Sequence, residues 1–518
     1  MSNHTYQFTS ESVSAGHPDK VADQLSDAIL DAYLAQDPNA KVACECLITT
    51  ELLLIAGEVT ANAYVDHTHI AKQVLERIGY NNDAVGFNHH NAEIRNLIHT
   101  QSPEIFNSVV DGGAGDQGIM FGHACNDTPE LMPLAITLSH QIVRKLHELR
   151  DQNTLPWLRP DAKSQVTVTY DENGPVSVDK VVVSTQHSED ISQAELHAAV
   201  IHHALEPILR EWIKIKQPEY IINPSGSFLI GGPHGDTGLT GRKIVVDTYG
   251  GSCPHGGGAF SGKDPSKVDR SAAYASRYIA KHLVASGVVR KCNVQLSYAI
   301  GLAEPTSIHI ESFGTHRCDL KLLERTIYAL FPVQPLAIIE AFGLKRPIYL
   351  ATATYGHFSN SDYPWEVLDD VKINALRAIT GVNLDAPNKD LPSQQFANDS
   401  AKQCFNRFIE DSEFGHLKMK WLSKKPFSAY LPFHVPDGLV QAVDKEEFEI
   451  PEDGVRLPIF LGSQFGYFPS LKSIEPIPDG YLHFLLAKSM LSGLVSGLSL
   501  RRWDAGQRQF QIVKEWKR

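Results

Sequence analysis

The residues best suited to chemistry are concentrated between Gly231 and Asp269, where glycine fills eleven of the thirty-nine positions. Glycine has no side chain, so backbone N–H groups in such a segment can approach a ligand closely. A polyphosphate bound with magnesium needs close backbone, fixed cations and carboxylates, and this segment supplies all three. The sequence therefore predicts a polyphosphate site here. The cations are Arg242, Lys243, Lys263 and Lys267, and the carboxylates are Asp236, Asp264 and Asp269.

Part of this segment, Gly257 to Lys263, fits the P-loop pattern G-x-x-x-x-G-K. Asp264 stands where a P-loop has the Ser or Thr that ligates magnesium, and no predicted strand directly precedes the segment, so an ordinary P-loop is disfavoured. A flexible surface loop is the bland alternative, but such loops seldom combine fixed cations with this many glycines. Lys263 and Lys267 are four residues apart across a helix start expected at Asp264, which predicts that their ammonium groups point to one side.

Three further short segments carry residues that could bind an anion or a metal. In HPDK, a helix N-terminus could bind phosphate beside His17, and Asp19 could ligate magnesium. In PDAKSQ, Asp161 and Lys163 are two apart on an expected strand and so share a face. GAGDQG displays Asp116 on a loop. Taken singly, each of these also fits an ordinary helix start, strand or turn.

Hydrophobic spacing predicts the elements that position these residues. Apolar residues recur every four positions from Val21 to Tyr33, which is typical of an amphipathic helix. Strands occur in pairs between long helices without strict βαβ alternation, and this pattern predicts an α+β architecture in several similar mixed layers. Helices are predicted at 17–38, 70–80, 130–150, 192–213, 266–287 and 318–331. Strands are predicted at 41–49, 51–65, 164–171, 179–186, 227–232, 243–249, 293–301 and 307–313.

Charge and aromatic content divide the chain near Gly381. The 47 Lys+Arg and 60 Asp+Glu residues give a net charge of -13, which argues against nonspecific nucleic-acid binding because phosphate backbones recruit positive faces. Residues 382–518 hold 17 cationic and 17 acidic side chains, so the whole excess of acidic groups lies in residues 1–381. The same 137 residues hold 18 of the 45 aromatics. Two separately built parts are predicted.

Neither a membrane nor an oxidising compartment is expected. The longest apolar stretch, Tyr481 to Leu500, is about long enough to span a bilayer, but His483, Lys488 and four serines interrupt it. It is therefore predicted to form a buried helix of a soluble protein. The seven cysteines are scattered, and the N-terminus lacks the basic and apolar regions of a signal peptide, which favours a cytoplasmic location.

Read together, the glycine-rich and charged segments resemble those of S-adenosylmethionine synthetases (methionine adenosyltransferases), in that family's order. The matching motifs are HPDK, GAGDQG, PDAKSQ, GGPHGDTGLTGRK and GGGAFSGKDPSKVDRSAAY, within about residues 4–380. The resemblance implies three similar α+β domains related by pseudo-threefold symmetry, followed here by an additional C-terminal α+β domain. The expected domains are 1–112, 113–231, 232–381 and 382–518.

The resemblance also implies a reaction. ATP, L-methionine and water would give S-adenosylmethionine, phosphate and diphosphate, because the methionine sulfur attacks C5' and displaces the whole triphosphate, which is then hydrolysed. A neutral thioether needs no base, whereas the leaving triphosphate needs cations and metals to neutralise its charge. Two Mg²⁺ and one K⁺ per site are implied. So is a homodimer with shared active sites, and dimers of this family often pair into a homotetramer.

Individual roles follow by matching motifs to the family. The implied catalytic residues around the triphosphate are His17, Lys163, Arg242, Lys243, Lys263 and Lys267. The implied substrate-binding residues are Glu58, Gln101, Asp116, Asp161, Phe228, Asp236 and Ala259. The implied metal ligands are Asp19 and Asp269 for magnesium and Glu45 for potassium.

Departures from the family pattern leave two alternatives open. Ser227 replaces a usual arginine, His123 a usual tyrosine and Ala15 a usual glutamate, while Ser252-Cys253-Pro254 alters the loop before HGGGAFSGKD. The segment between 101 and 113 is also shorter than the family's gating loop. A catalytically weak regulatory paralogue that binds nucleotide and a partner protein is one alternative. A synthetase with altered thioether specificity is the other.

The region after Gly381 has no counterpart in the family. Its Trp421, Trp503 and Trp516 could form a binding face for an unknown partner, although aromatic residues in a domain of this size more often lie in its core.

Overall fold

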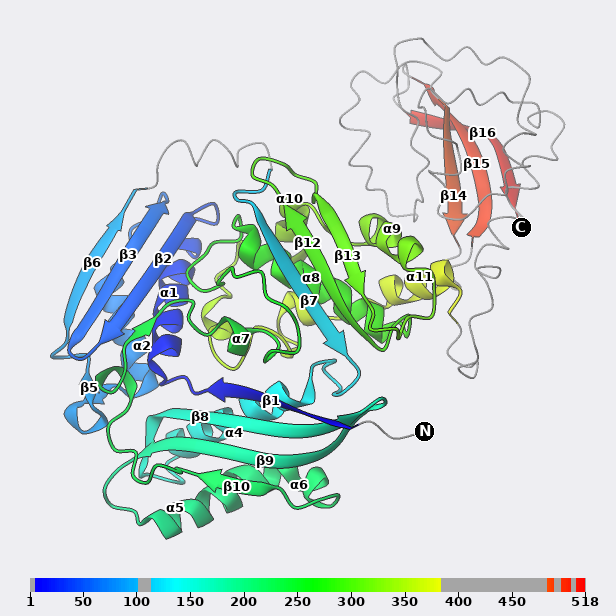
Figure 1. Ribbon diagram of the computed structural model, residues 1–518. Helices are drawn as coiled ribbons and strands as arrows, with labels where there is room; N and C mark the ends of the chain where they lie inside the picture. Colours follow the sequence, from blue (N-terminus) through cyan, green and yellow to red (C-terminus); the bar gives the residue numbers. More distant parts are fainter. Residues whose placement is uncertain (1–4, 101–112, 383–481, 489–494, 505–508, 518) are drawn as a thin grey trace. The chain divides into compact units, whose positions relative to one another are not determined.

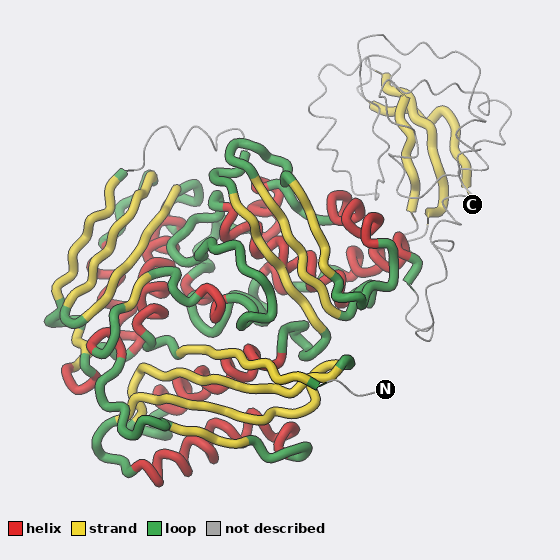
Figure 2. The backbone as a smooth tube through the Cα atoms, viewed as in Figure 1, coloured by secondary structure: helices red, strands yellow, loops and turns green. Residues whose placement is uncertain are grey.

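The computed structural model describes residues 5–100 and 113–382 together with the strands 482–488, 495–504 and 509–517 (Figures 1 and 2). The chain divides into two compact units. The first comprises most of residues 1–368 and holds three larger sheets, two of mixed orientation and one antiparallel. The second holds residues 285–289, 314–331 and 369–518.

The first sheet has the strand order β1-β8-β9-β10, with β1 antiparallel to β8, β8 antiparallel to β9, and β10 parallel to β9. Its strands are long and rich in valine, and alternate residues such as Val166, Val168, Val181 and Val183 are fully buried. They form one hydrophobic core with α4 and with the α5–α6 segment, which continues through a π-helix at Ile201–Leu205. The elements are β1 (Tyr6–Val13), α4 (Leu134–Asp151), β8 (Leu158–Asp171), β9 (Gly174–His187), α5 (Gln193–Val200), α6 (Glu206–Ile213) and β10 (Glu219–Ile222).

The second sheet has the order β11-β2-β3-β6. Along β2 the residues facing α1, such as Cys44 and Ile48, are buried, whereas Glu45 is exposed on the opposite face. The helix α2 packs against α1, and a short hairpin of β4 and β5 follows it. The elements are α1 (Pro18–Leu34), β2 (Lys41–Thr49), β3 (Leu52–Thr60), α2 (His67–Ile78), β4 (Asn81–Asn82), β5 (Phe87–Asn88), β6 (Glu93–His99) and β11 (Gly238–Leu239).

The third sheet has the order β13-β12-β7 and is antiparallel throughout. The helix α8 crosses close to β7, since a Cβ atom added at Gly122 would lie 2.0 Å from the backbone of Ser276. Only glycine permits this approach. The elements are β7 (Gly118–Cys125), α7 (Ile244–Asp247), α8 (Val268–Ala285), β12 (Lys291–Tyr298), β13 (Ser307–Glu311) and α10 (Pro335–Phe342).

Each sheet includes a strand from a distant part of the chain. The N-terminal strand β1 pairs with β8, β7 pairs with β12, and β11 pairs with β2. Figure 1 shows the three sheets around a shared interior that contains α7. The predicted α+β class with three similar mixed layers is confirmed, and the layers are interwoven.

Two strands predicted in the synthetase-like part are wrong. Residues 227–232 form no strand: Phe228 donates its N–H to His187 Nε2 at 3.1 Å and accepts the His187 N–H at 3.0 Å. Residues 243–249 include the helical turn α7, because the Asp247 N–H bonds to Lys243 O at 2.8 Å and its carboxylate is bound by Lys20. Tertiary polar contacts overrode the strand propensity of Val245 and Val246 in this turn.

The predicted helix at Tyr481–Leu500 is also wrong, because the chain there forms β14 (Leu482–Lys488) and β15 (Val495–Asp504). Glycine and serine weaken helices, and the sequence from Leu498 to Arg501 alternates in polarity as a strand does. These strands form an antiparallel sheet with β16 (Gln509–Lys517). The second unit also contains α9 (Leu320–Leu330) and α11 (Asp370–Thr380).

Among the described helices, none is by itself long and apolar enough to cross a bilayer. The bent pair of α9 and α10 meets that test only when both helices are taken together, by length and composition alone.

Candidate active site

Four aspartates of α1 fasten later segments of the chain to this helix. They occur at every fourth position and therefore lie along one face. Each accepts hydrogen bonds from backbone N–H groups of a segment far away in the sequence. Three of the four hold the two glycine-rich segments, residues 231–243 and 256–264, through their backbone. Asp19 accepts from Leu239 (2.9 Å), Asp23 from Gly241 (2.8 Å), Asp27 from Gly262 (2.8 Å), and Asp31 from Tyr349 (3.0 Å) and Leu350 (2.8 Å).

Buried cations balance the carboxylates in the middle of this row. Asp27 forms a two-point ion pair with Arg270, with distances of 2.6 and 2.8 Å and both side chains fully buried. Lys20 lies between Asp23 (2.8 Å) and Asp247 (2.5 Å). Burial raises the pKa of Asp247 to about 7, although the charge of Lys20 opposes this shift. The spacing of the four aspartates was visible in the sequence, but the polyphosphate interpretation gave it no role.

The first group of predicted site residues lies at the start of α1. Asp19 is buried, and its carboxylate accepts a hydrogen bond from Lys243, with Arg242 at 3.8 Å. Burial alone would raise the pKa of Asp19, but the hydrogen bonds from Lys243 and Leu239 outweigh it and lower the pKa below its usual value. Asp19 is therefore a carboxylate paired with a lysine that is 20% exposed.

His17 caps the helix beside Asp19 and is almost fully buried. Burial, together with the nearby charges of Lys243 and Lys163, lowers the pKa of His17 to about 3. The ring is therefore neutral near pH 7. Because Nδ1 accepts the Asp19 N–H at 3.2 Å, the proton of the neutral ring is assigned to Nε2, which becomes a hydrogen-bond donor.

Asp161 and its neighbours complete this first group. Asp161 Oδ2 accepts the Gly232 N–H at 2.9 Å, while Oδ1 is buried and has no hydrogen-bond partner among the described residues. Burial raises the pKa of Asp161 to about 6, the charge of Asp236 adds to this, and the charges of Lys163 and Lys243 oppose it. An orphaned buried acceptor of this kind is typical of a place where a ligand donor binds.

The second group surrounds the N-terminus of α8. Lys263 pairs with Asp269 at 2.7 Å, and Lys267 pairs with the buried Asp264. Because α8 begins at Val268, the prediction that a helix starting at Asp264 aligns Lys263 and Lys267 is wrong. Each lysine instead contacts a different carboxylate.

Two glycines, one in a loop and one at the start of β7, shape the space around Asp269. A Cβ atom at Gly258 would lie 2.3 Å from Asp269 Oδ1, and one at Gly118 would lie 3.5 Å away. The two groups adjoin each other because a Cβ atom at Gly241 would lie 2.5 Å from that of Ala259. Gly118 is the last residue of the GAGDQG segment that the sequence had singled out.

Four other predicted site residues form no hydrogen bond or ion pair with either group in the described part of the chain. Glu45 and Glu58 project from the same side of the second sheet, and Glu58 contacts His99 at 3.4 Å. Asp116 is exposed on its loop, and Phe228 is half-buried beside His187. Gln101 lies outside the described residues.

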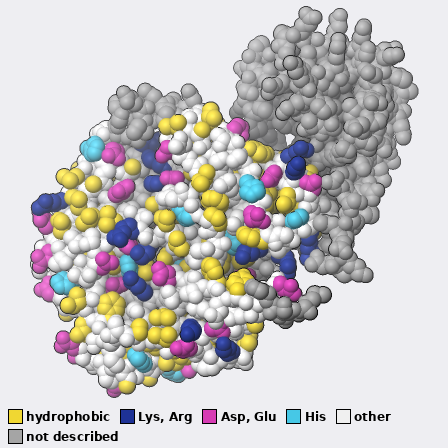
Figure 3. Space-filling model, in the orientation of Figure 1, with side chains coloured by type: hydrophobic (Ala, Val, Ile, Leu, Met, Phe, Trp, Pro, Cys, Tyr) yellow, Lys and Arg dark blue, Asp and Glu magenta, His cyan; other side chains and the backbone are white. Residues whose placement is uncertain are grey.

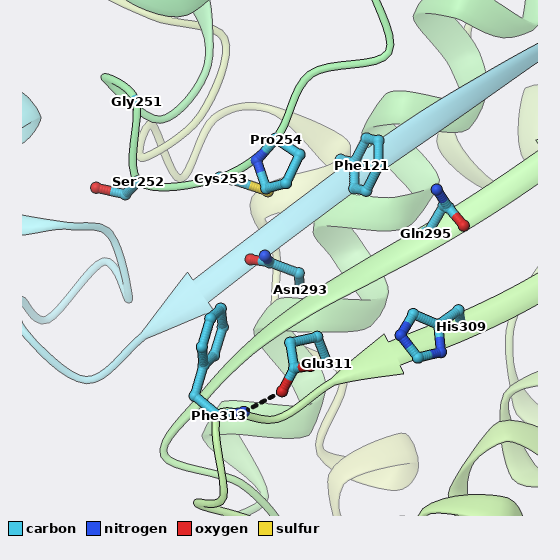
Figure 4. Close-up of a pocket in the computed structure, with 10 residues that line it drawn as sticks. All are labelled: Phe121, Gly251, Ser252, Cys253, Pro254, Asn293, Gln295, His309, Glu311 and Phe313. Atoms are coloured by element: carbon cyan, nitrogen blue, oxygen red, sulfur yellow. Dashed lines mark hydrogen bonds between the residues drawn. The ribbon is translucent and has the colours of Figure 1, made fainter.

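The loop that departs from the family pattern borders a separate pocket. A cavity of about 390 Å³ lies between this loop, at Gly251–Pro254, and β7, β12 and β13 (Figure 4). The predicted catalytic and metal-binding residues do not line it. The nearby His123 is buried and bonds Asn293 at 2.6 Å. Across the face in Figure 3, Lys and Arg side chains are interspersed with Asp and Glu.

Three family models match consecutive parts of the chain. The N-terminal domain of S-adenosylmethionine synthetase matches residues 5–103, the central domain matches residues 111–228, and the C-terminal domain matches residues 230–367. The chain belongs to the S-adenosylmethionine synthetase family. All of the predicted site residues lie within the three matched ranges, and residues 368–518 lie beyond them.

The carboxylates of this synthetase suit magnesium that is shared with a substrate. Asp19 and Asp269 each offer carboxylate oxygens, which are the ligand atoms that magnesium prefers. Each carboxylate is paired with a lysine ammonium, so a positive charge is already bound at both positions. Magnesium commonly binds through one or two carboxylates plus substrate phosphates, which is what two separated aspartates provide. Glu45 offers a single exposed carboxylate, which can supply one of the several oxygens that a potassium ion needs.

Proposed function

We propose that this synthetase is a methionine adenosyltransferase, which forms S-adenosylmethionine from ATP and L-methionine and converts the displaced triphosphate to phosphate and diphosphate. One observation carries the proposal. Two glycine-rich segments are fastened to α1, and beside them Lys243 and Lys263 are held by Asp19 and Asp269 at positions where phosphate oxygens would compete for the same ammonium groups.

The residues would act mainly through electrostatics. The lysines would move from carboxylate to phosphate oxygens when the triphosphate binds, and Lys163 and Arg242 would add to the positive field. His17 would donate its Nε2 proton in a hydrogen bond to the bridging oxygen, because its low pKa keeps the ring neutral and Nδ1 is occupied. No residue needs to act as a base towards the thioether.

Magnesium would be held by Asp19 and Asp269, and potassium by Glu45. When bound, magnesium supplies positive charge to the triphosphate oxygens, while potassium orders the site. The release of Lys243 and Lys263 onto phosphate would leave the two aspartates available as ligands.

Further residues would hold the substrate. Phe228 and Asp236 would hold the substrate and its adenine. Glu58, Gln101 and Asp116 would lie near the methionine or the sugar. We propose a homodimer with shared active sites, or a tetramer of two dimers, in which a second copy would cover the sheet face that carries Glu45 and Glu58. A cytoplasmic location fits the availability of ATP there. We propose the region after Gly381 as a candidate binding site for an unknown partner protein.

The proposal is tested by comparing two lysines of the same sheet. Lys163 on β8 lies near enough to His17 and Asp161 for its charge to oppose protonation of both groups. Lys180 on β9 is half exposed and pairs with Glu219 at 3.0 Å. With ATP, methionine, magnesium and potassium, Lys163→Met should reduce product formation by about 10²-fold or more, as expected when a preorganised charge is removed. Lys180→Met should match the wild type.

Equal activity of Lys163→Met and the wild type would reject the assigned role. A folded wild type that binds ATP yet forms no product would instead favour the regulatory paralogue. A panel of methionine analogues would reveal altered thioether specificity if one analogue exceeded methionine.

A further inference from the structure

Three potential metal ligands come together where the last turn of α2 lies beside the residues that follow β5. Glu76 lies in the last turn of α2, and His89 and His90 follow β5. The β4–β5 hairpin pairs Asn81 with Asn88, which turns the chain back towards the helix. As a result, one ligand atom from each of Glu76, His89 and His90 lies within 4.8 Å of the others, and no other such trio of His, Cys, Asp or Glu occurs among the described residues.

The central histidine of this trio is buried and incompletely hydrogen-bonded. His89 is 4% exposed, and its Nε2 lies 2.6 Å from Glu76 Oε2. Its Nδ1 is buried and has no hydrogen-bond partner in the described part of the chain. The ring of His90 lies against it, with 4.0 Å between centroids. The second oxygen of Glu76 accepts a hydrogen bond from Asn81 at 3.2 Å, which orients the carboxylate.

We infer that Glu76, His89 and His90 form a binding site for a divalent transition-metal ion of the zinc type, separate from the proposed transferase site. Two imidazoles and one carboxylate suit zinc, whereas magnesium and calcium prefer an all-oxygen set. The three side chains leave a fourth position for water.

The geometry needs only small adjustments to take the ion. With metal–ligand distances of about 2.1 Å, tetrahedral ligand atoms are roughly 3.4 Å apart. The ligand atoms of His89 and Glu76, now 2.6 Å apart, must therefore separate, while the His90 nitrogen, within 4.8 Å of both, adjusts to the same spacing. The Glu76 side chain is 54% exposed and His90 is exposed, so both can move while the buried His89 stays fixed.

The bound ion would fasten the hairpin to α2 and so support a neighbouring tyrosine. The His89 N–H bonds to Tyr80 O at 3.1 Å, and the Tyr80 hydroxyl donates to Gly16 O at 2.5 Å. Tyr80 thus connects the hairpin to the segment before α1. We assign the ion this stabilising role alone.

A second pair of adjacent histidines offers a matched control. His202 and His203 lie in the π-helix with Glu206 at 3.3 Å from His202, but these three do not bring their ligand atoms together. His203→Ala therefore removes a partly exposed histidine that follows another histidine and lies three residues before a glutamate.

The test is a zinc titration of the metal-free full-length protein in excess magnesium, read by competition with a chromogenic chelator. We expect one zinc per chain in the wild type, and at least about tenfold weaker binding in His90→Ala and in Glu76→Gln. His203→Ala should bind as the wild type does. Cobalt in place of zinc should give the strong visible absorption of a four- or five-coordinate ion, which both site variants lose.

Absence of zinc binding by the wild type would overturn the inference. So would equal affinity of the wild type and both site variants, or an equal loss in His203→Ala. Both site variants change surface side chains, and circular dichroism of each would show that a lost affinity does not reflect unfolding.

Discussion

Replacing Asp27 by asparagine tests whether the buried charges of α1 hold the glycine-rich segments. Asp27 bonds Arg270 through both oxygens and also accepts the Gly262 N–H. Asparagine keeps the shape and one acceptor but removes the charge, which leaves a buried guanidinium without its counter-ion. Breaking such a pair costs about 3–5 kcal/mol. Because asparagine keeps one hydrogen-bond acceptor, we expect the free energy of unfolding to fall by about 3 kcal/mol, the lower end of this range.

The assay is urea unfolding of Asp27→Asn and of Glu211→Gln at one protein concentration. Glu211 also contacts a lysine through both oxygens, at 2.8 and 2.7 Å, but both side chains of that pair are more than 60% exposed. Water screens an exposed pair, so the control should be indistinguishable from the wild type. If Asp27→Asn proved as stable as the control, the aspartate row would not be what fastens Gly262 and the adjacent Lys263.

Three other expectations concern the site and its surroundings. Gly258→Ala should lower product formation by about 10²-fold, because the new methyl group would lie 2.3 Å from Asp269 Oδ1 and displace it; unchanged initial rates would refute this. Burial lowers the pKa of His123 to about 3. In the unfolded chain this histidine binds a proton below about pH 6.5, whereas in the folded protein it stays neutral, so the free energy of unfolding falls as the pH falls. Between pH 7.5 and 5 this amounts to about 2 kcal/mol, so urea unfolding of His123→Asn should show that much less acid sensitivity, and an equal sensitivity would count against it. Ser227→Arg should tighten ATP binding in a calorimetric titration, since it adds a cation beside Phe228, and unchanged affinity would contradict that reasoning.

The sequence predicted those elements whose own pattern agrees with their tertiary setting. The spacing of apolar residues was enough to place α1, although nearly all of its residues are buried and not one face alone. The alternation of β2 was enough because its alternate residues are the buried ones. The strand expected at 243–249 failed, since its valines belong to a turn that Lys20 and Asp247 determine across more than two hundred residues. Contacts between residues so far apart in the chain cannot be recognised from the local sequence pattern.

The candidate site likewise has features that the sequence predicts and features that it does not. The glycine-rich segments and their lysines could be singled out from residue type and density, and their role as a polyphosphate site stays a prediction. Their partners could not: the pairing of Lys243 with Asp19, and of Lys263 with Asp269, depends on how loops fold against α1 and α8. The neutral state of His17 likewise follows from its burial and its neighbours, which the motif HPDK does not specify.

The most direct test of the proposed activity is mass spectrometry of the products formed by the full-length protein. With ATP, L-methionine, magnesium and potassium, we expect S-adenosylmethionine, phosphate and diphosphate in equal amounts, and no S-adenosylmethionine when methionine is omitted. A folded protein that binds ATP but releases no S-adenosylmethionine, or that releases ADP or AMP in its place, would contradict the proposal.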